Sequence, residues 1–303
     1  MAKLVECIPN FSISEEQDPQ GFKELVDLCM SLPGCTLFDK QSDGNHNRTV
    51  FTLIGSPEGI EEAAFQLTKE AAGLIDMRAH KGQHPRMGAT DVMPFVPQQD
   101  VTLDECVEMS KRVAKRIWEE LHIPSFLYED SASRPERRNL ADCRRGEFEG
   151  MPEKLLQPEW APDFGERKIH PTAGIMAIGA RMPLVAFNIN LNTDDVTIAK
   201  DIAKKVRGSS GGFPYCKALG IMLEDRGITQ VSMNMVNYEK TTLFEVYDTV
   251  KALAMIHGVD IIGSEIVGLT PAKALIDCAE HYLKIEKFHA FEQVIEYHLL
   301  DMM

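Results

Sequence analysis

Several features that mark other classes of protein are missing from this sequence. No apolar run approaches the ~20 residues that a membrane-spanning helix requires, and residues 1–6 contain no signal-peptide core. Basic residues are also in deficit, since 32 Lys and Arg stand against 46 Asp and Glu for a formal net charge of -14. A nucleic-acid surface or an anionic membrane would need a broad basic face. We therefore expect a cytoplasmic protein with neither kind of partner.

Cysteine usage excludes two further classes. The seven cysteines are odd in number, and none forms a Cys-x-x-Cys pair. Reduced thiols fit this pattern better than a disulfide scaffold or a zinc finger. The glycine-rich stretch 207–212 is not followed by Gly-Lys-Ser/Thr, so it is not a P-loop. What remains is a 303-residue chain of ordinary globular composition, long enough for two domains.

The order of predicted elements repeats in the two halves of the chain. Strands are predicted at 4–8, 36–40, 49–54, 90–96, 184–189, 219–223, 230–236 and 259–267, and helices at 22–30, 57–74, 194–206 and 242–256. Each half has the order β-α-β-β-α-β, the split βαβ unit. We expect an α/β (α+β) fold with two βαββαβ ferredoxin-like subdomains, residues 1–181 and 182–303. The competing interpretation is one large mixed α/β sheet.

A long connector separates the two repeats. It contains a predicted amphipathic helix at 103–121, a short strand at 125–127 and a charged segment, 134–157, predicted to be helical with its arginines on a solvated face. Residues 159–174 show no periodicity, and composition alone suggests an ordinary linker. A last helix is predicted at 273–284, followed by a helical tail at 290–300.

One loop, residues 78–88, concentrates positive charge in this acidic protein. It contains His80 and His84, and Gly82, Gly88 and Pro85 prevent a regular helix. His84 could act as a general acid/base near neutral pH, or it could hydrogen-bond locally. The His80-x-x-x-His84 spacing also occurs in helical zinc sites, but this segment is not a helix and lacks the zincin glutamate, so we expect no metal.

Three cations of the same loop could clamp the carboxylates of a small anionic substrate. Arg78 and Arg86 would do so with a bidentate fork, and Lys81 as a point charge. The alternative is a solvated surface run, paired with acidic side chains elsewhere.

Six stretches follow one another in a consistent order along nearly the whole chain. They are Leu4-Val-Glu-Cys-Ile-Pro-Asn-Phe-Ser12, Asn47-Arg-Thr-Val50, His80-Lys-Gly-Gln-His-Pro-Arg-Met-Gly88, Trp160-Ala-Pro-Asp-Phe-Gly165, Ala186-Phe-Asn-Ile-Asn-Leu191 and Val267-Gly-Leu269. Together they resemble the glutamate formimidoyltransferase family, which includes the formiminotransferase half of the bifunctional vertebrate formimidoyltransferase-cyclodeaminase.

The resemblance implies transfer of a formimidoyl group between N-formimidoyl-L-glutamate and tetrahydrofolate, a step of histidine degradation, with tetrahydrofolate as co-substrate. It implies that His84 is the catalytic proton-transfer residue, that the two subdomains flank a ligand cleft, and that the protein is a homodimer. The family's folate-binding segment falls here on Gly165, Glu166, Arg167, Lys168, Ile169, His170, Pro171, Thr172, Ala173 and Gly174.

The sequence also departs from the family pattern. Gln83 occupies a position that is Glu in the vertebrate proteins, and residues 166–171 diverge, so backbone contacts to folate are expected there more than side-chain contacts. The sequence ends at residue 303 without a cyclodeaminase domain, so we expect no channelling of product within the chain. Two alternatives remain open: a same-fold transferase using N-formylglutamate or 5-formyltetrahydrofolate, and a non-catalytic folate-binding protein.

Overall fold

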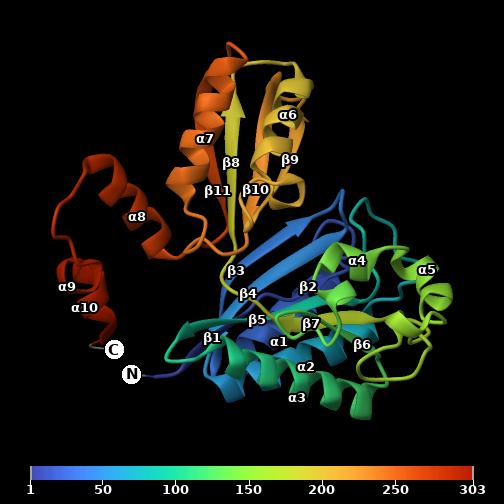
Figure 1. Cartoon of the computed structure of the whole chain (residues 1–303). Helices are drawn as coiled ribbons and strands as arrows, with labels where there is room; N and C mark the ends of the chain where they lie inside the picture. Colours follow the sequence, from blue (N-terminus) through green and yellow to red (C-terminus); the bar gives the residue numbers. More distant parts are fainter. Residues whose placement is uncertain (1, 302–303) are drawn as a thin grey trace. The chain divides into compact units, whose positions relative to one another are not determined.

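The computed structural model describes residues 2–301 and divides the chain into two compact units, with the division between Arg181 and Met182 (Figure 1). The units contain separate sheets, one of seven strands and one of four. This confirms the predicted α/β class with two α+β units, and the alternative of one large sheet is wrong. None of the described helices is long and apolar enough to cross a membrane.

The sheet of the first unit is built around a split βαβ core. Its strands are β1 (Leu4–Cys7), β2 (Asn10–Phe11), β3 (Cys35–Asp43), β4 (Arg48–Gly55), β5 (Thr90–Gln99), β6 (Ser125–Glu129) and β7 (Met176–Ala180). β1 and β2 both lie between β4 and β5 and pair with both of them. They are two strands rather than one because Pro9, which has no N–H to donate, lies between them. β3 pairs with β4 on one side, and β7 and β6 extend the sheet in parallel beyond β5.

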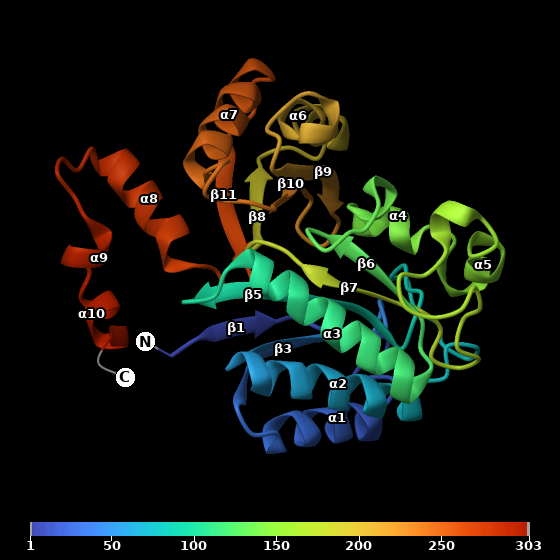
Figure 2. The ribbon, with the colours of Figure 1, turned by 60° about the horizontal axis from the view of Figure 1, so that its bottom comes forward.

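Three helices cover one face of this sheet: α1 (Pro19–Ser31), α2 (Pro57–Leu74) and α3 (Leu103–Leu121) (Figure 2). Each begins at a side-chain cap, Asp18, Ser56 or Thr102, that accepts a hydrogen bond from a backbone N–H of the first turn. Beneath them, the Phe51 ring packs edge-on against Phe11 and Phe22, with ring centroids 5.4 and 6.3 Å away. This layer of helices packs on the sheet and so holds β5, and the loop that precedes β5, in place.

The second unit repeats the split βαβ arrangement. Its strands are β8 (Val185–Leu191), β9 (Cys216–Leu223), β10 (Ile228–Met235) and β11 (Ile261–Val267), in the order β11-β8-β10-β9. Two helices, α6 (Val196–Val206) and α7 (Leu243–Ile256), bury one face of the sheet. The chain continues through α8 (Ala272–Leu283), α9 (Ala290–Gln293) and α10 (Ile295–Asp301).

The connector differs from its prediction. Residues 134–157 form a 3₁₀ helix (Pro135–Arg137), α4 (Leu140–Arg144) and α5 (Glu147–Lys154), because Gly146 adopts a φ of 95° and ends the helical run. The strand β7 was not predicted; its five small or apolar residues are all buried between β5 and β6.

The sequence suggested that Arg137 lies on a solvated face, but in the structure its side chain is fully buried. Its guanidinium pairs with Asp163 and donates to the Glu159 carbonyl at 2.9 Å. Asp163 also accepts the backbone N–H of Leu127 at 2.7 Å. This pair anchors the segment that precedes Gly165 against β6.

Removing the Arg137–Asp163 ion pair tests whether it anchors this segment. Arg137→Ala should lower the free energy of unfolding by about 3–5 kcal/mol, because the largely buried Asp163 carboxylate would lose its compensating charge. Chemical denaturation measures the change. Arg138→Ala is the matched control: Arg138 is exposed, with no side-chain partner among residues 2–301, and its loss should stay within about 0.5 kcal/mol. Equal stability of the two variants would contradict the anchor.

Candidate active site

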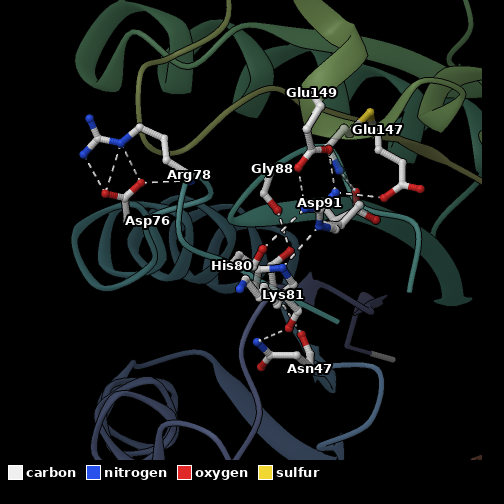
Figure 3. A network of polar contacts seen from close by, with 12 residues as sticks. Asn47, Asp76, Arg78, His80, Lys81, Gly88, Asp91, Glu147 and Glu149 are labelled. Carbon is white, nitrogen blue, oxygen red and sulfur yellow. Dashed lines mark hydrogen bonds and ion pairs between the residues drawn. The ribbon is translucent and has the colours of Figure 1, made fainter. Parts of the chain in front are cut away.

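The basic loop is held against the turn between β3 and β4. The Asn47 side-chain amide donates to the Lys81 carbonyl at 2.9 Å (Figure 3). The Gln83 N–H donates to the Asn45 carbonyl at 3.1 Å. Asn47 itself has a left-handed φ of 47°, which asparagine tolerates better than most residues. The turn therefore gives the loop a fixed support although the loop has no regular structure of its own.

A second network holds the loop from the other side. Arg86 is 8% exposed and donates to Glu147 at 2.8 Å and to Glu149 at 2.7 Å from its two terminal nitrogens. Its Nε donates to His80 Nδ1 at 3.2 Å, and His80 Nε2 lies 3.0 Å from the Asn47 carbonyl. Both His80 nitrogens are thus engaged, and burial lowers the pKa of His80. His80 is a neutral link between α5 and the β3–β4 turn.

His84 differs from His80 in having no hydrogen bond to any of the described residues. It is half-buried, and its ring faces the His46 ring edge-on at 6.4 Å. Burial and, to a lesser extent, the positive charges of Arg48 and Arg144 together lower the pKa of His84 to about 3. The structure therefore presents a neutral imidazole whose two nitrogens remain open to a ligand.

The expected folate segment pairs with this loop through the backbone. The Ala89 N–H donates to the Ala173 carbonyl at 2.9 Å, and the Ile175 N–H to the Met87 carbonyl at 3.1 Å. At the crossing point, a Cβ added to Gly88 would lie 2.3 Å from the Ile175 oxygen, so only glycine fits. Segments far apart in sequence are brought side by side.

An open hollow of ≈ 500 Å³ lies along the same segment. Its lining comes from the C-terminal end of α3 and from the segment: Trp118, Glu119, His122, Glu166, Lys168, Ile169, His170 and Pro171. Glu166, Arg167 and Lys168 are exposed, whereas Ala173 and Gly174 are buried against the loop. The segment thus has one anchored end and one accessible end.

The three cations expected to form a clamp have different surroundings. Arg78 is exposed and turns to Asp76, with Nε 2.9 Å from Oδ1 (Figure 3). Arg86 is committed to Glu147 and Glu149. Lys81 is exposed, and its ammonium has no partner in the described part of the chain. Of the three cationic groups, that of Lys81 alone lacks a counter-charge from the residues that the structure describes.

Sequence reasoning missed several residues around His84. Asp91, 2% exposed, accepts the Met87 N–H at 2.8 Å and an Arg144 Nε–H at 2.7 Å. Arg48 and Arg144 supply the positive field at His84. The sequence signal for Arg48 was its place in the Asn47–Val50 stretch. Nothing in the sequence pointed to Arg144, because it is far from the loop in sequence and only folding brings it near.

Between residues 2 and 301, no three His, Cys, Asp or Glu side chains gather as a metal site would require.

Comparisons with known proteins cover both units. Residues 4–181 match the family model "Formiminotransferase domain, N-terminal subdomain", and residues 186–300 match "Formiminotransferase domain". The chain is 63% identical to the glutamate formimidoyltransferase of Streptococcus pyogenes serotype M1, over 99% of this chain and 100% of that protein. It is 43% identical to the glutamate formimidoyltransferase of Thermoplasma acidophilum, over 94% of each. The formimidoyltransferase-cyclodeaminase of Rattus norvegicus is 41% identical, over 97% of this chain and 55% of that protein.

The tautomer of His80 is a direct test of the loop network. Arg86 can only donate and the Asn47 carbonyl can only accept, so the His80 proton must reside on Nε2. Long-range ¹H–¹⁵N correlation spectra at pH 7 should show a neutral ring protonated at Nε2. Arg86→Met should weaken this preference, because only the Asn47 carbonyl would then favour a proton on Nε2, whereas Lys81→Met should leave it unchanged. A ring protonated at Nδ1 in the unaltered protein would contradict the network.

Proposed function

The chain belongs to the formiminotransferase family, and we propose that it transfers a formimidoyl group between N-formimidoyl-L-glutamate and tetrahydrofolate, with His84 as the proton carrier. The two family-model matches and the 63% identity to a glutamate formimidoyltransferase confirm the resemblance found in the sequence. The observation that supports the role of His84 is its neutral imidazole, which has no hydrogen-bond partner among the described residues and is held on a loop that is supported from two sides.

The transfer requires one proton to move from N5 of tetrahydrofolate to the nitrogen of glutamate. The N5 lone pair of tetrahydrofolate forms a bond to the formimidoyl carbon, which leaves N5 with a positive charge and a proton to lose. A neutral imidazole accepts this proton and then delivers it to the glutamate nitrogen as the carbon–nitrogen bond to glutamate breaks. The products are L-glutamate and 5-formimidoyltetrahydrofolate.

No covalent enzyme intermediate is needed for this transfer. The two substrates react directly, so holding them together supplies much of the rate. The cysteines also lack the character of nucleophiles: burial raises the pKa of Cys106 and of Cys143 to about 12.

The folate co-substrate is assigned to the segment Gly165–Gly174. Support comes from its backbone pairing with the His84 loop and from the hollow along its exposed part. Trp118, His122 and His170 give the hollow aromatic surfaces against which a flat heterocycle could stack. Lys81, with its ammonium unpaired in the described structure, is retained as a carboxylate contact. The homodimer and the cytoplasmic location stay predictions from the sequence.

Replacing His84 tests its role. His84→Ala should reduce turnover by roughly 10²–10⁴-fold, the usual contribution of a positioned acid/base. Steady-state kinetics with both substrates measure the effect, and circular dichroism checks the fold. His289→Ala, an exposed histidine of the second unit, is the control and should keep full activity. Near-normal turnover of His84→Ala would remove the assigned role.

The same assay separates the alternative functions. Tetrahydrofolate is mixed with N-formimidoyl-L-glutamate or N-formyl-L-glutamate, and the folate spectrum is followed. Faster reaction of the formyl donor would favour the formyltransferase, and folate binding without turnover of either donor would favour a binding protein.

Intrinsic fluorescence tests the folate assignment. The chain has two tryptophans; Trp118 lines the hollow, whereas Trp160 packs against Phe126 with ring centroids 5.8 Å apart. Tetrahydrofolate should quench the wild-type emission, and Trp118→Phe should abolish most of the quenching, whereas Trp160→Phe should retain it. Quenching that is unchanged in Trp118→Phe would place the heterocycle elsewhere.

A further inference from the structure

Arg48, the first residue of β4, is a partly buried cation without a counter-charge among the described residues. Its guanidinium has no hydrogen bond or ion pair with any residue that the structure describes. The two carboxylates that act electrostatically on Arg48, Asp91 and Asp43, are already engaged with other groups. Asp43, opposite Arg48 in the β3–β4 register, accepts from the His46 backbone and ring at 2.9 and 2.8 Å, and Asp91 is held by Arg144.

A second unsatisfied group lies next to it in the chain. Asn47 is 8% exposed, and its Oδ1 is buried without a donor among the residues described. The amide orientation is set, because Nδ2 donates to the Lys81 carbonyl. Arg48 and Asn47 thus offer, side by side in sequence, a cation that lacks an anion and an acceptor that lacks an N–H.

Such groups are unfavourable in an empty site. Arginine cannot lose its proton at physiological pH, so burial leaves its charge in place. Burying an unpaired charge, or a polar atom without a partner, destabilises a protein. A ligand carboxylate would satisfy Arg48, because the guanidinium fork matches a carboxylate in two hydrogen bonds.

We propose that Arg48 binds a carboxylate of the glutamate donor beside His84. This inference rests on the proposed function. It assigns to Arg48 the task that the sequence suggested for Arg78 and Arg86, whose charges are already balanced by Asp76 and by two glutamates.

The bound carboxylate would also change His84 as a base. The charged and titratable groups that act on His84 are Arg48 from β4, Arg144 from α4, His46 from the turn and His80 from the loop, and all disfavour the imidazolium. An imidazole with a pKa of about 3 accepts a proton poorly at neutral pH. A negative charge at Arg48 opposes one of these cations, so the pKa of His84 rises in the complex. Binding of the glutamate donor would thus make His84 a stronger base for the proton transfer that follows.

A titration of His84 by NMR tests this coupling, with L-glutamate as the probe. In the free protein the His84 ring should stay neutral from pH 8 down to pH 5. Saturating glutamate should raise the His84 pKa by about one unit or more. Arg48→Met keeps the apolar stem and removes the charge, so it should raise the pKa in the free protein and abolish the response to glutamate. Glutamate that binds without moving His84 would overturn the proposal.

Kinetics give a second, independent readout. Arg48→Met should raise the KM for N-formimidoyl-L-glutamate by roughly 10- to 100-fold, the usual loss of a charge-assisted hydrogen bond, with little change in the KM for tetrahydrofolate. Arg48→Lys keeps the charge without the fork and should recover part of the loss; it also serves if Arg48→Met does not fold. Arg112→Met, an exposed arginine of α3, is the control and should behave as wild type.

The outcomes distinguish this inference from the proposed function. Transfer with an unchanged donor KM in both Arg48 variants would overturn the inference and leave the function standing. Glutamate binding that depends on Arg48, with no transfer to tetrahydrofolate, would support the inference and reject the function.

Discussion

The contact between Gly88 and Gly174 is the constraint on which the site depends. A Cβ on Gly174 would lie 2.3 Å from the Met87 oxygen, and its φ of 74° is itself unfavourable for other residues. With two glycines, the backbones approach closely enough for direct hydrogen bonds between residues 87–89 and 173–175. That pairing places the His84 loop beside the proposed folate segment and directs the chain into β7, which joins β5 to β6.

The distribution of charge decides the chemistry of the loop. Arg86, Arg144 and His46 each have a carboxylate partner: the Glu147–Glu149 pair, Asp91 and Asp43, respectively. Arg48 has none within the described structure, and it lies with Arg144 among the cations that keep His84 neutral. An acidic protein can therefore present a locally cationic surface, because its acids neutralise selected cations and leave others for a ligand.

Elements with strong local signals were predicted well. α2 begins at Pro57 and ends at Leu74, and α3 spans 103–121, as the sequence indicated, because capping residues and helical apolar spacing act over a few residues. β7 and the break between α4 and α5 were missed. β7 is a run of small and apolar residues whose strand conformation comes from its two neighbours, and the break depends on one glycine in a left-handed conformation.

The sequence by itself determined the two split βαβ units and the family, and it singled out the 78–88 loop as the candidate site, since hydrophobic periodicity and contiguous motifs are properties of neighbouring residues. It could not decide the partners of the charges. Arg86, Arg48 and Arg137 are alike as residues, yet one is committed to two glutamates, one has no partner in the described structure, and one is buried against Asp163. Only the tertiary structure separates them, because ion pairing and burial depend on distances between residues that folding brings together.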